Sequence, residues 1–191
     1  MRLVPRTLSL APVLAVVLAA AGVLAAGADA QQAPDPERCR THPEWRQLDF
    51  WIGTWDVVHP EDGRPLGVNV IEPVLNHCAL VERWTAARGG TGTSLNFYDP
   101  QRRTWRQVWV DAFGNVLDYR AGEFRDRAMR FSGVSLGPDG DSTFQKLTFH
   151  HVAADTVRQV FESSKDRGAT WTVDWVGIYI RTAPPDPGAR D

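Results

Sequence analysis

The sequence has few cysteines and no excess of charge of either sign. Its 191 residues include only two cysteines, Cys39 and Cys78, which are too far apart for the clustered ligand spacing of a zinc site. The formal net charge is -2, so there is no electrostatic reason to expect a nucleic acid or an anionic membrane as partner. Nucleophile elbows, phosphate loops and dinucleotide fingerprints are also absent from the sequence, which therefore points to no familiar catalytic class.

The first 30 residues have the pattern of a secretory signal peptide. Arg2 and Arg6 give a positive start, residues 8–26 are apolar, and residues 28–30 form a small-x-small cleavage site. We therefore expect a periplasmic or secreted protein with no membrane contact after cleavage. Because the apolar stretch is long, an uncleaved membrane anchor is the alternative. No cysteine follows the stretch closely enough to carry a lipid.

The two cysteines are expected to form a disulfide, because an exported protein folds in an oxidising compartment. The bond between Cys39 and Cys78 would join the N-terminal segment to the turn before the third strand. Closing a loop of about 40 residues would stabilise the fold by about 4 kcal/mol. Two free or buried thiols are the alternative, since the sequence does not give the Cα separation that a disulfide needs.

Residues 54–181 alternate short strand-like runs with turn residues and show no strong helical pattern. The runs are 54–59, 67–72, 79–85, 91–98, 104–111, 116–124, 128–134, 142–153, 156–163 and 170–181. The short turns between them force neighbouring strands to pair antiparallel. A meander of this length hides its edges only by closing. The expected fold is all-β, an antiparallel up-and-down barrel of about ten strands.

Three further segments flank the strands. Residues 31–42 are polar and Pro-rich, and we expect a flexible arm. From Pro43 onward, apolar residues at helical spacing predict a short helical plug packed across one end of the barrel. The barrel domain, including this plug, spans residues 43–181, and the Pro-containing residues 182–191 are expected to form a disordered tail.

Residues 164–171 match the pattern Ser-x-Asp-x-Gly-x-Thr-Trp of an Asp-box. The pattern resembles a hairpin whose aspartate, here Asp166, accepts backbone hydrogen bonds and whose tryptophan, here Trp171, packs beneath. Sialidase-like propellers repeat such a box in each blade, whereas this sequence has one copy and no blade-length repeat. We therefore expect the box to fix the last hairpin and to have no role in glycan cleavage.

A Gly-x-Trp at Gly53 and Trp55, with Arg181 on the last strand, resembles the calycin superfamily of lipocalins, fatty-acid-binding proteins and nitrobindin-like barrels. Longer motifs resemble an uncharacterised bacterial family with a lipocalin-like barrel; they are residues 48–56, 78–84, 92–99 and 105–111. The resemblance covers residues 43–181. It implies that Trp55 stacks under Arg181 to close the barrel, a contact worth about 0.5–2 kcal/mol. It carries no established activity.

Strand parity predicts which side chains face the barrel interior. On the last strand, Trp171, Val173, Trp175 and Tyr179 share one face. Eight tryptophans suit an aromatic pocket for a small apolar or aromatic molecule. The candidate ligand-binding residues are Glu82, Trp84, Gln107, Trp109, Asp111, His151 and Tyr179.

Other functions stay open. An enzyme would use Glu82, Asp111 or His151 as acid or base beside Tyr98 or Tyr119. A carboxylate among tryptophan rings would have a raised pKa and could transfer protons near neutral pH. A scaffold protein would have a filled barrel and bind partners on its outer face.

In nitrobindin-like barrels a late histidine ligates haem, but the last strand here contains no histidine, so no haem is expected. His42, His59 and His77 are not clustered with carboxylates at metal-ligand spacing, so no metal is expected, and no other cofactor is predicted.

Overall fold

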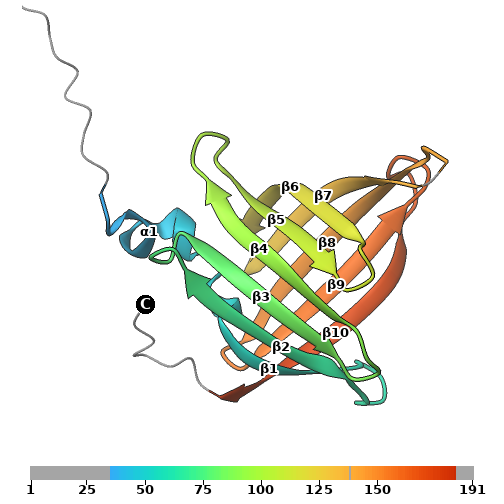
Figure 1. Ribbon diagram of the computed structural model, residues 1–191, viewed down its shortest axis with the longest axis horizontal. Coiled ribbons are helices and arrows are strands. Elements are labelled where there is room, and N and C mark those ends of the chain that lie inside the picture. Colours follow the sequence, from blue (N-terminus) through green and yellow to red (C-terminus); the bar gives the residue numbers. More distant parts are fainter. Residues whose placement is uncertain (1–34, 138, 184–191) are drawn as a thin grey trace, which may run out of the picture. The chain divides into compact units, whose positions relative to one another are not determined.

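The computed structural model describes residues 35–137 and 139–183, and within them ten strands form a closed antiparallel barrel (Figure 1). The strands are β1 (Gly53–Val58), β2 (Pro65–Val74), β3 (Ala79–Ala86), β4 (Thr91–Asp99), β5 (Thr104–Asp111), β6 (Val116–Arg125), β7 (Ala128–Leu136), β8 (Ser142–Ala153), β9 (Thr156–Ser164) and β10 (Thr172–Ala183). Each strand pairs with the next along the chain, and β1 pairs with β10. The expected fold is confirmed.

The barrel core follows from the alternation of side chains along each strand. In β1, Trp55 and Val57 are fully buried while Asp56 between them is exposed. The same period recurs around the barrel, so the inward residues of successive strands meet in one cluster. The predicted signal segment, residues 1–30, and residues 184–191 of the predicted tail lie outside the described residues. Thr182, which was expected in the tail, belongs to β10.

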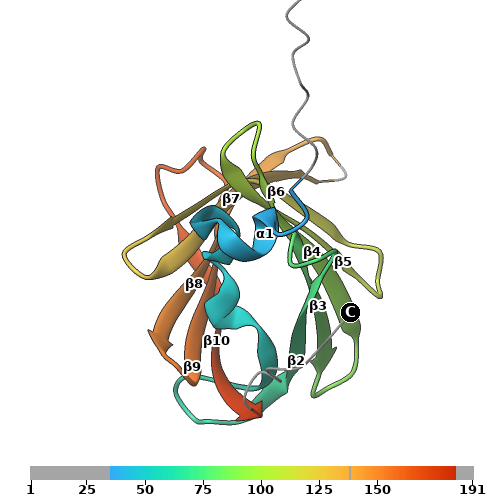
Figure 2. The same ribbon diagram turned by 90° about the vertical axis from the view of Figure 1, so that its left-hand side faces the viewer.

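Short helical turns cover one end of the barrel (Figure 2). They are α1 (Arg38–Thr41), η1 (Pro43–Arg46) and η2 (Asp49–Trp51). The expected plug is thus present: Leu48 and Trp51 are fully buried, and the Trp51 ring centroid lies 4.5 Å from that of Phe149 on β8. Within the described part of the chain, no helix has the length and apolar character needed to cross a membrane.

The plug is fastened to the turn between β2 and β3. Cys39 in α1 forms a disulfide with Cys78, as predicted. Nearby, the guanidinium of Arg46 lies 3.1 Å from Nδ1 of His77. Residues 38–41, which we expected in a flexible arm, are helical, and Cys39 is buried. The disulfide accounts for this difference, because it holds a segment of little intrinsic stability against the barrel.

Arg181 closes the barrel beside the plug. Its guanidinium carbon lies 4.0 Å from the centroid of the Trp55 ring, which is the stacking that the calycin resemblance implies. Gly53 has a φ of 134°, and a Cβ at this position would overlap the Arg181 guanidinium. The glycine of the Gly-x-Trp motif is therefore required both by its backbone conformation and by the space that Arg181 occupies.

The Asp-box forms the hairpin between β9 and β10. Asp166 accepts hydrogen bonds from the Ser164 hydroxyl at 2.7 Å and from the Thr170 backbone N–H at 2.8 Å. These bonds, with one from the Thr170 hydroxyl, lower the pKa of Asp166 to about 2. The Trp171 indole donates to the Gly168 carbonyl at 3.0 Å. The box therefore stabilises the hairpin through its own side chains, as expected.

The expectation that Trp171 and Val173 face inward is wrong. The pairing of β10 with β9 shifts register between Val173 and Trp175, so the alternation restarts there. Val173 is 56% exposed, and Trp171 lies under the ammonium of Lys146, which is 3.6 Å from its ring centroid. Only the part of β10 from Trp175 onward therefore contributes its predicted face to the interior.

Candidate ligand-binding cavity

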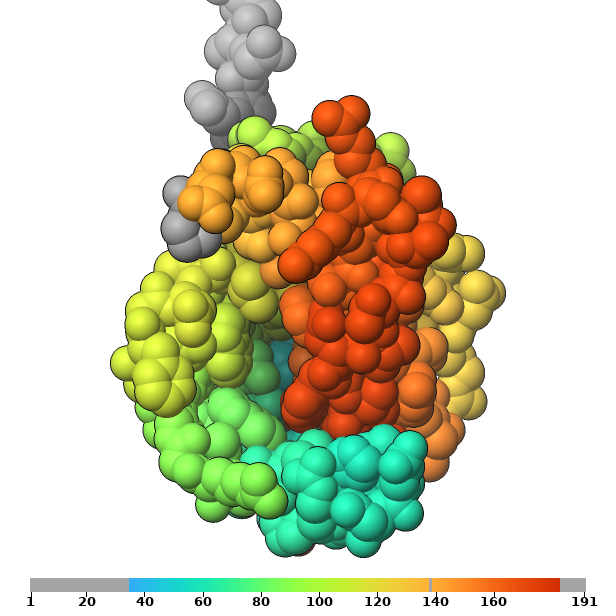
Figure 3. Space-filling model, turned by 90° about the vertical axis from the view of Figure 1, so that its right-hand side faces the viewer, coloured from blue at the N-terminus to red at the C-terminus, as the bar shows by residue number. Residues whose placement is uncertain are grey.

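A cavity of about 200 Å³ lies inside the barrel. The plug covers one end of the barrel, whereas the space-filling view of the other end shows a hollow between the strand ends (Figures 2 and 3). The residues that line the cavity are Glu82, Trp84, Gln107, Trp109, Leu117, Tyr119, Leu147, Gln159, Phe161, Trp175 and Tyr179. They come from β3, β5, β6, β8, β9 and β10, so the site depends on the closed barrel.

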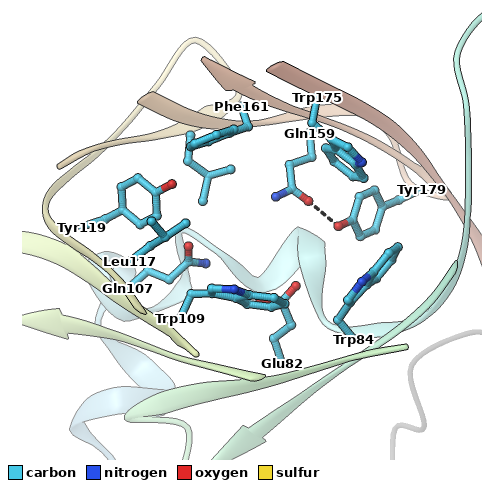
Figure 4. Close-up of a pocket in the computed structure, with 11 residues that line it drawn as sticks. Glu82, Trp84, Gln107, Trp109, Leu117, Tyr119, Gln159, Phe161, Trp175 and Tyr179 are labelled. Atoms are coloured by element: carbon cyan, nitrogen blue, oxygen red, sulfur yellow. Dashed lines mark hydrogen bonds between the residues drawn. The ribbon is translucent and has the colours of Figure 1, made fainter. Parts of the chain in front are cut away.

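Glycines let the tryptophan rings lie close to the barrel wall. A Cβ added at Gly92 on β4 would overlap the ring of Trp109, and one added at Gly67 on β2 would overlap that of Trp84. Gly177 has the same relationship to Trp175. Because these rings lie against backbone that carries no side chain, they line the interior without filling its centre. The close-up shows them arranged around an open space (Figure 4).

A buried carboxylate lies in the cavity wall. Glu82 is 4% exposed, and each of its oxygens accepts one hydrogen bond: Oε1 from the Asn69 amide at 2.7 Å and Oε2 from the Ser94 hydroxyl at 2.6 Å. Burial raises the pKa of Glu82, and the two hydrogen bonds lower it by less. Behind Glu82, Asn96 donates to Ser94 at 2.8 Å and accepts from Gln107 at 2.7 Å. The polar groups thus form a connected network.

Two tyrosines complete the polar part of the lining. The Tyr179 hydroxyl donates to Oε1 of Gln159 and accepts from the Asn69 amide at 3.3 Å. Tyr119 is 1% exposed, and its hydroxyl has no hydrogen-bond partner among the described residues, although it points toward the cavity (Figure 4). Burial raises the pKa of both tyrosines, which keeps both hydroxyls protonated at neutral pH. The Tyr119 hydroxyl is free to bond to a ligand.

The structure brings five of the seven predicted site residues into this cavity; they are Glu82, Trp84, Gln107, Trp109 and Tyr179. Asp111 lies elsewhere, because at the end of β5 its carboxylate turns to accept hydrogen bonds from the backbone N–H groups of Phe113 at 2.9 Å and Asn115 at 3.0 Å. His151 also lies outside the cavity. It is near the plug, where its ring stacks on Phe50 with centroids 4.9 Å apart. Both placements correct the sequence-based expectation.

Six lining residues were not among the seven candidate ligand-binding residues: Leu117, Tyr119, Leu147, Gln159, Phe161 and Trp175. Trp175 was expected on the inward face, and Tyr119 was considered only as a partner of an acid or base. The signal was present for two pairs, because Leu117 and Tyr119 on β6, like Gln159 and Phe161 on β9, are two residues apart and share a face. Asn69 was missed as well. It lies at an inward position of β2, where a buried amide must find a partner.

The described residues contain no group of three or more His, Cys, Asp or Glu side chains placed to hold a metal ion. The polar atoms of the cavity are one carboxylate, side-chain amides, indole N–H groups and tyrosine hydroxyls. This set can orient a small molecule by hydrogen bonds and surround it with aromatic surface.

The comparisons with known proteins add no family to this description. No family model matches the sequence, and no curated protein matches it. The function is therefore argued from the cavity itself.

Proposed function

We propose that the protein binds a small, mostly apolar or aromatic molecule in the barrel cavity, and that it does so after export to the periplasm or secretion. The observation that carries the proposal is the aromatic cavity with an unpaired hydroxyl in its lining. Trp84, Trp109 and Trp175 supply apolar surface, and the buried Tyr119 hydroxyl has a hydrogen bond to offer. A few polar groups within aromatic walls are the usual composition of a small-molecule site.

The cavity also limits the size of the ligand. Sites for drug-sized molecules have volumes of about 300–1,000 Å³. At about 200 Å³ this cavity is smaller, so it suits a compact molecule, and its open end gives that molecule a way in (Figure 3).

The proposed compartment and family have separate support. The disulfide between Cys39 and Cys78 is consistent with an oxidising compartment, and the first 30 residues have the pattern of a signal peptide. The stacking of Arg181 on Trp55 supports the proposal that the chain is related to the calycins. A calycin barrel would suit ligand binding, but the ligand is proposed here from the cavity and not from that relationship.

Binding is tested by titrating the protein with an apolar fluorescent probe. We expect saturable quenching of tryptophan emission, because three indole rings line the cavity. Trp109→Ala should enlarge the site and change the probe affinity. Arg83→Ala and Arg106→Ala, one residue from Glu82 and Gln107 on the outer face, should leave it unchanged. If the arginine variants lost probe binding and Trp109→Ala kept the wild-type affinity, the proposed binding site would be wrong.

Mass spectrometry of the protein purified from its native host tests the same proposal without a chosen probe. A compound that recurs in independent preparations supports binding. Chemical turnover of that compound would instead identify an enzyme, with Glu82 as the acid or base that the cavity offers. Failure to retain any compound, together with no probe quenching, would favour a scaffold.

A further inference from the structure

Where the structure describes it, the cavity lining contains an acidic side chain and no basic one. Glu82 is the only acidic residue among the described residues that line the cavity, and the lining includes no lysine, arginine or histidine. The closest partners of the carboxylate are the neutral side chains of Asn69 and Ser94, and both donate to it. An arrangement in which both oxygens only accept suits the ionised carboxylate. A buried carboxylate without a cationic partner is costly to ionise, which is why burial raises the pKa of Glu82, and the described lining supplies no such partner.

Aromatic rings lie around this carboxylate. In the close-up, Trp84 and Trp109 lie on either side of Glu82, Tyr179 lies close to it, and Trp175 lies beyond Tyr179 (Figure 4). The Asn69 amide donates to both Glu82 and Tyr179. The rings of Trp84 and Trp175 are nearly perpendicular, with centroids 6.3 Å apart. The two rings are therefore in edge-to-face contact, and together with the Trp109 ring they supply π-electron surface to the cavity lining. Such surface attracts organic cations, and tryptophan attracts them most strongly.

We propose that the ligand is a small organic cation, a tertiary or quaternary ammonium, whose positive centre lies between the tryptophan rings and the Glu82 carboxylate. This inference rests on the proposed binding function and names the ligand class. The alkyl groups of such a cation are apolar, so they suit the aromatic walls as well as a neutral ligand would. The ammonium adds the positive charge that the lining lacks. An anionic ligand is disfavoured, because it would lie beside Glu82.

The first test compares two molecules of the same shape in the wild-type protein. Choline carries a quaternary nitrogen, and 3,3-dimethyl-1-butanol carries a carbon in its place. We expect choline to bind at least about tenfold more tightly by calorimetry, because a desolvated cation–π contact and a carboxylate both favour the charged molecule. Equal or tighter binding of the alcohol would overturn the inference and leave the proposed binding function standing.

The second test uses pH. Choline keeps its charge at every pH, so a change in its affinity reports on the protein alone. The affinity should rise as the pH rises through the pKa of Glu82, while that of the alcohol should stay level. Of the side chains that face Glu82, Asn69 on β2 and Ser94 on β4 do not titrate, and Tyr179 on β10 stays protonated. A choline affinity that does not depend on pH would contradict the inference.

The third test removes the carboxylate. Glu82→Gln should weaken choline binding at least about tenfold, abolish its pH dependence and leave the alcohol unaffected. Glu123→Gln, at an exposed position of β6, is the matched control and should change the affinity for neither ligand. If Glu82→Gln does not fold, the wild-type comparison and the pH profile decide. If choline and the alcohol both fail to bind, the inference falls; if apolar probes and native preparations also show no ligand, the proposed function falls with it.

Discussion

Arg181 joins the last strand to both Trp55 and the plug. Its guanidinium stacks on the Trp55 ring at 4.0 Å and donates hydrogen bonds to the backbone carbonyls of Ile52 at 2.5 Å and Phe50 at 3.2 Å. The Trp55 indole in turn donates to the Trp51 carbonyl at 2.8 Å. One cation therefore connects β10, β1 and η2 at the covered end of the barrel, which leaves the opposite end free for a cavity.

This relationship predicts coupling between two substitutions. Trp55→Ala should lower the free energy of unfolding by about 3–5 kcal/mol, since the ring is fully buried. Arg181→Ala should also destabilise the fold. The double variant should cost less than the sum by about 0.5–3 kcal/mol, because both substitutions remove one contact. Urea denaturation measures all three.

Trp55→Ala combined with Arg120→Ala, an exposed and separate position, provides the control and should be additive. If the Trp55 and Arg181 substitutions were equally additive, the two side chains would make no energetic contact.

Reduction of the Cys39–Cys78 disulfide should destabilise the fold. The bond closes a loop with a sequence separation of 39, for which the chain-entropy model gives about 4 kcal/mol. Chemical denaturation with and without reductant measures the difference, and intact mass should show two hydrogens fewer in the oxidised protein. Labelling of both cysteines by a thiol reagent in the native, unreduced protein would contradict the bond.

Asp49 should make stability depend on pH in the acidic range. Burial raises its pKa from 3.8 to about 6, although the neighbouring Arg46 acts in the opposite direction. The folded protein therefore holds the proton of the Asp49 carboxyl group more tightly than the unfolded chain does. The associated stability is fully present below about pH 4 and is lost as the pH rises through about 6. We expect a loss of about 1 kcal/mol, since partial exposure reduces the effect.

Asp49→Asn should remove that loss, as seen in unfolding free energies measured from pH 4 to pH 7. Asp56→Asn, at an exposed position on β1, should keep it. The quantity to compare is the pH dependence of the unfolding free energy in the variant and in the wild type. The raised pKa of Glu82 also makes stability fall as the pH rises, but it does so equally in both proteins. A wild-type profile parallel to that of Asp49→Asn would argue against a raised pKa at this site.

Gly92→Ala should disturb the cavity through Trp109. A Cβ at residue 92 would overlap the indole, which must move toward the centre of the barrel. We expect a loss of about 1–3 kcal/mol in stability and weaker probe binding. Gly137→Ala is the control, since its Cβ would have only an ordinary contact of 3.7 Å. Unchanged binding in Gly92→Ala would show that the ring position does not define the site.

Sequence alone determined the strands, the plug and the faces of most strands. Their signals are local: alternation with a period of two, turn residues at short intervals, and apolar residues at helical spacing after Pro43. The alternation of side chains predicted the wrong face for Trp171 and Val173, because the pairing of β10 with β9 shifts register between Val173 and Trp175. A register shift depends on the pairing of two strands, so the alternation within either strand does not reveal it.

For the site, the sequence determined that Glu82, Trp84 and Trp109 lie on the inward faces of their strands. The tertiary structure decided how far along the barrel axis each of these residues lies. Asp111 and Trp109 share a face by parity, yet Asp111 ends its strand and bonds to a turn. His151 has inward parity but reaches the plug. The face on which a side chain lies is set by the backbone of its own strand. The position of the side chain along the barrel axis is set by the stagger of all ten strands around the closed barrel, and so is the lack of a partner for the Tyr119 hydroxyl among the described residues.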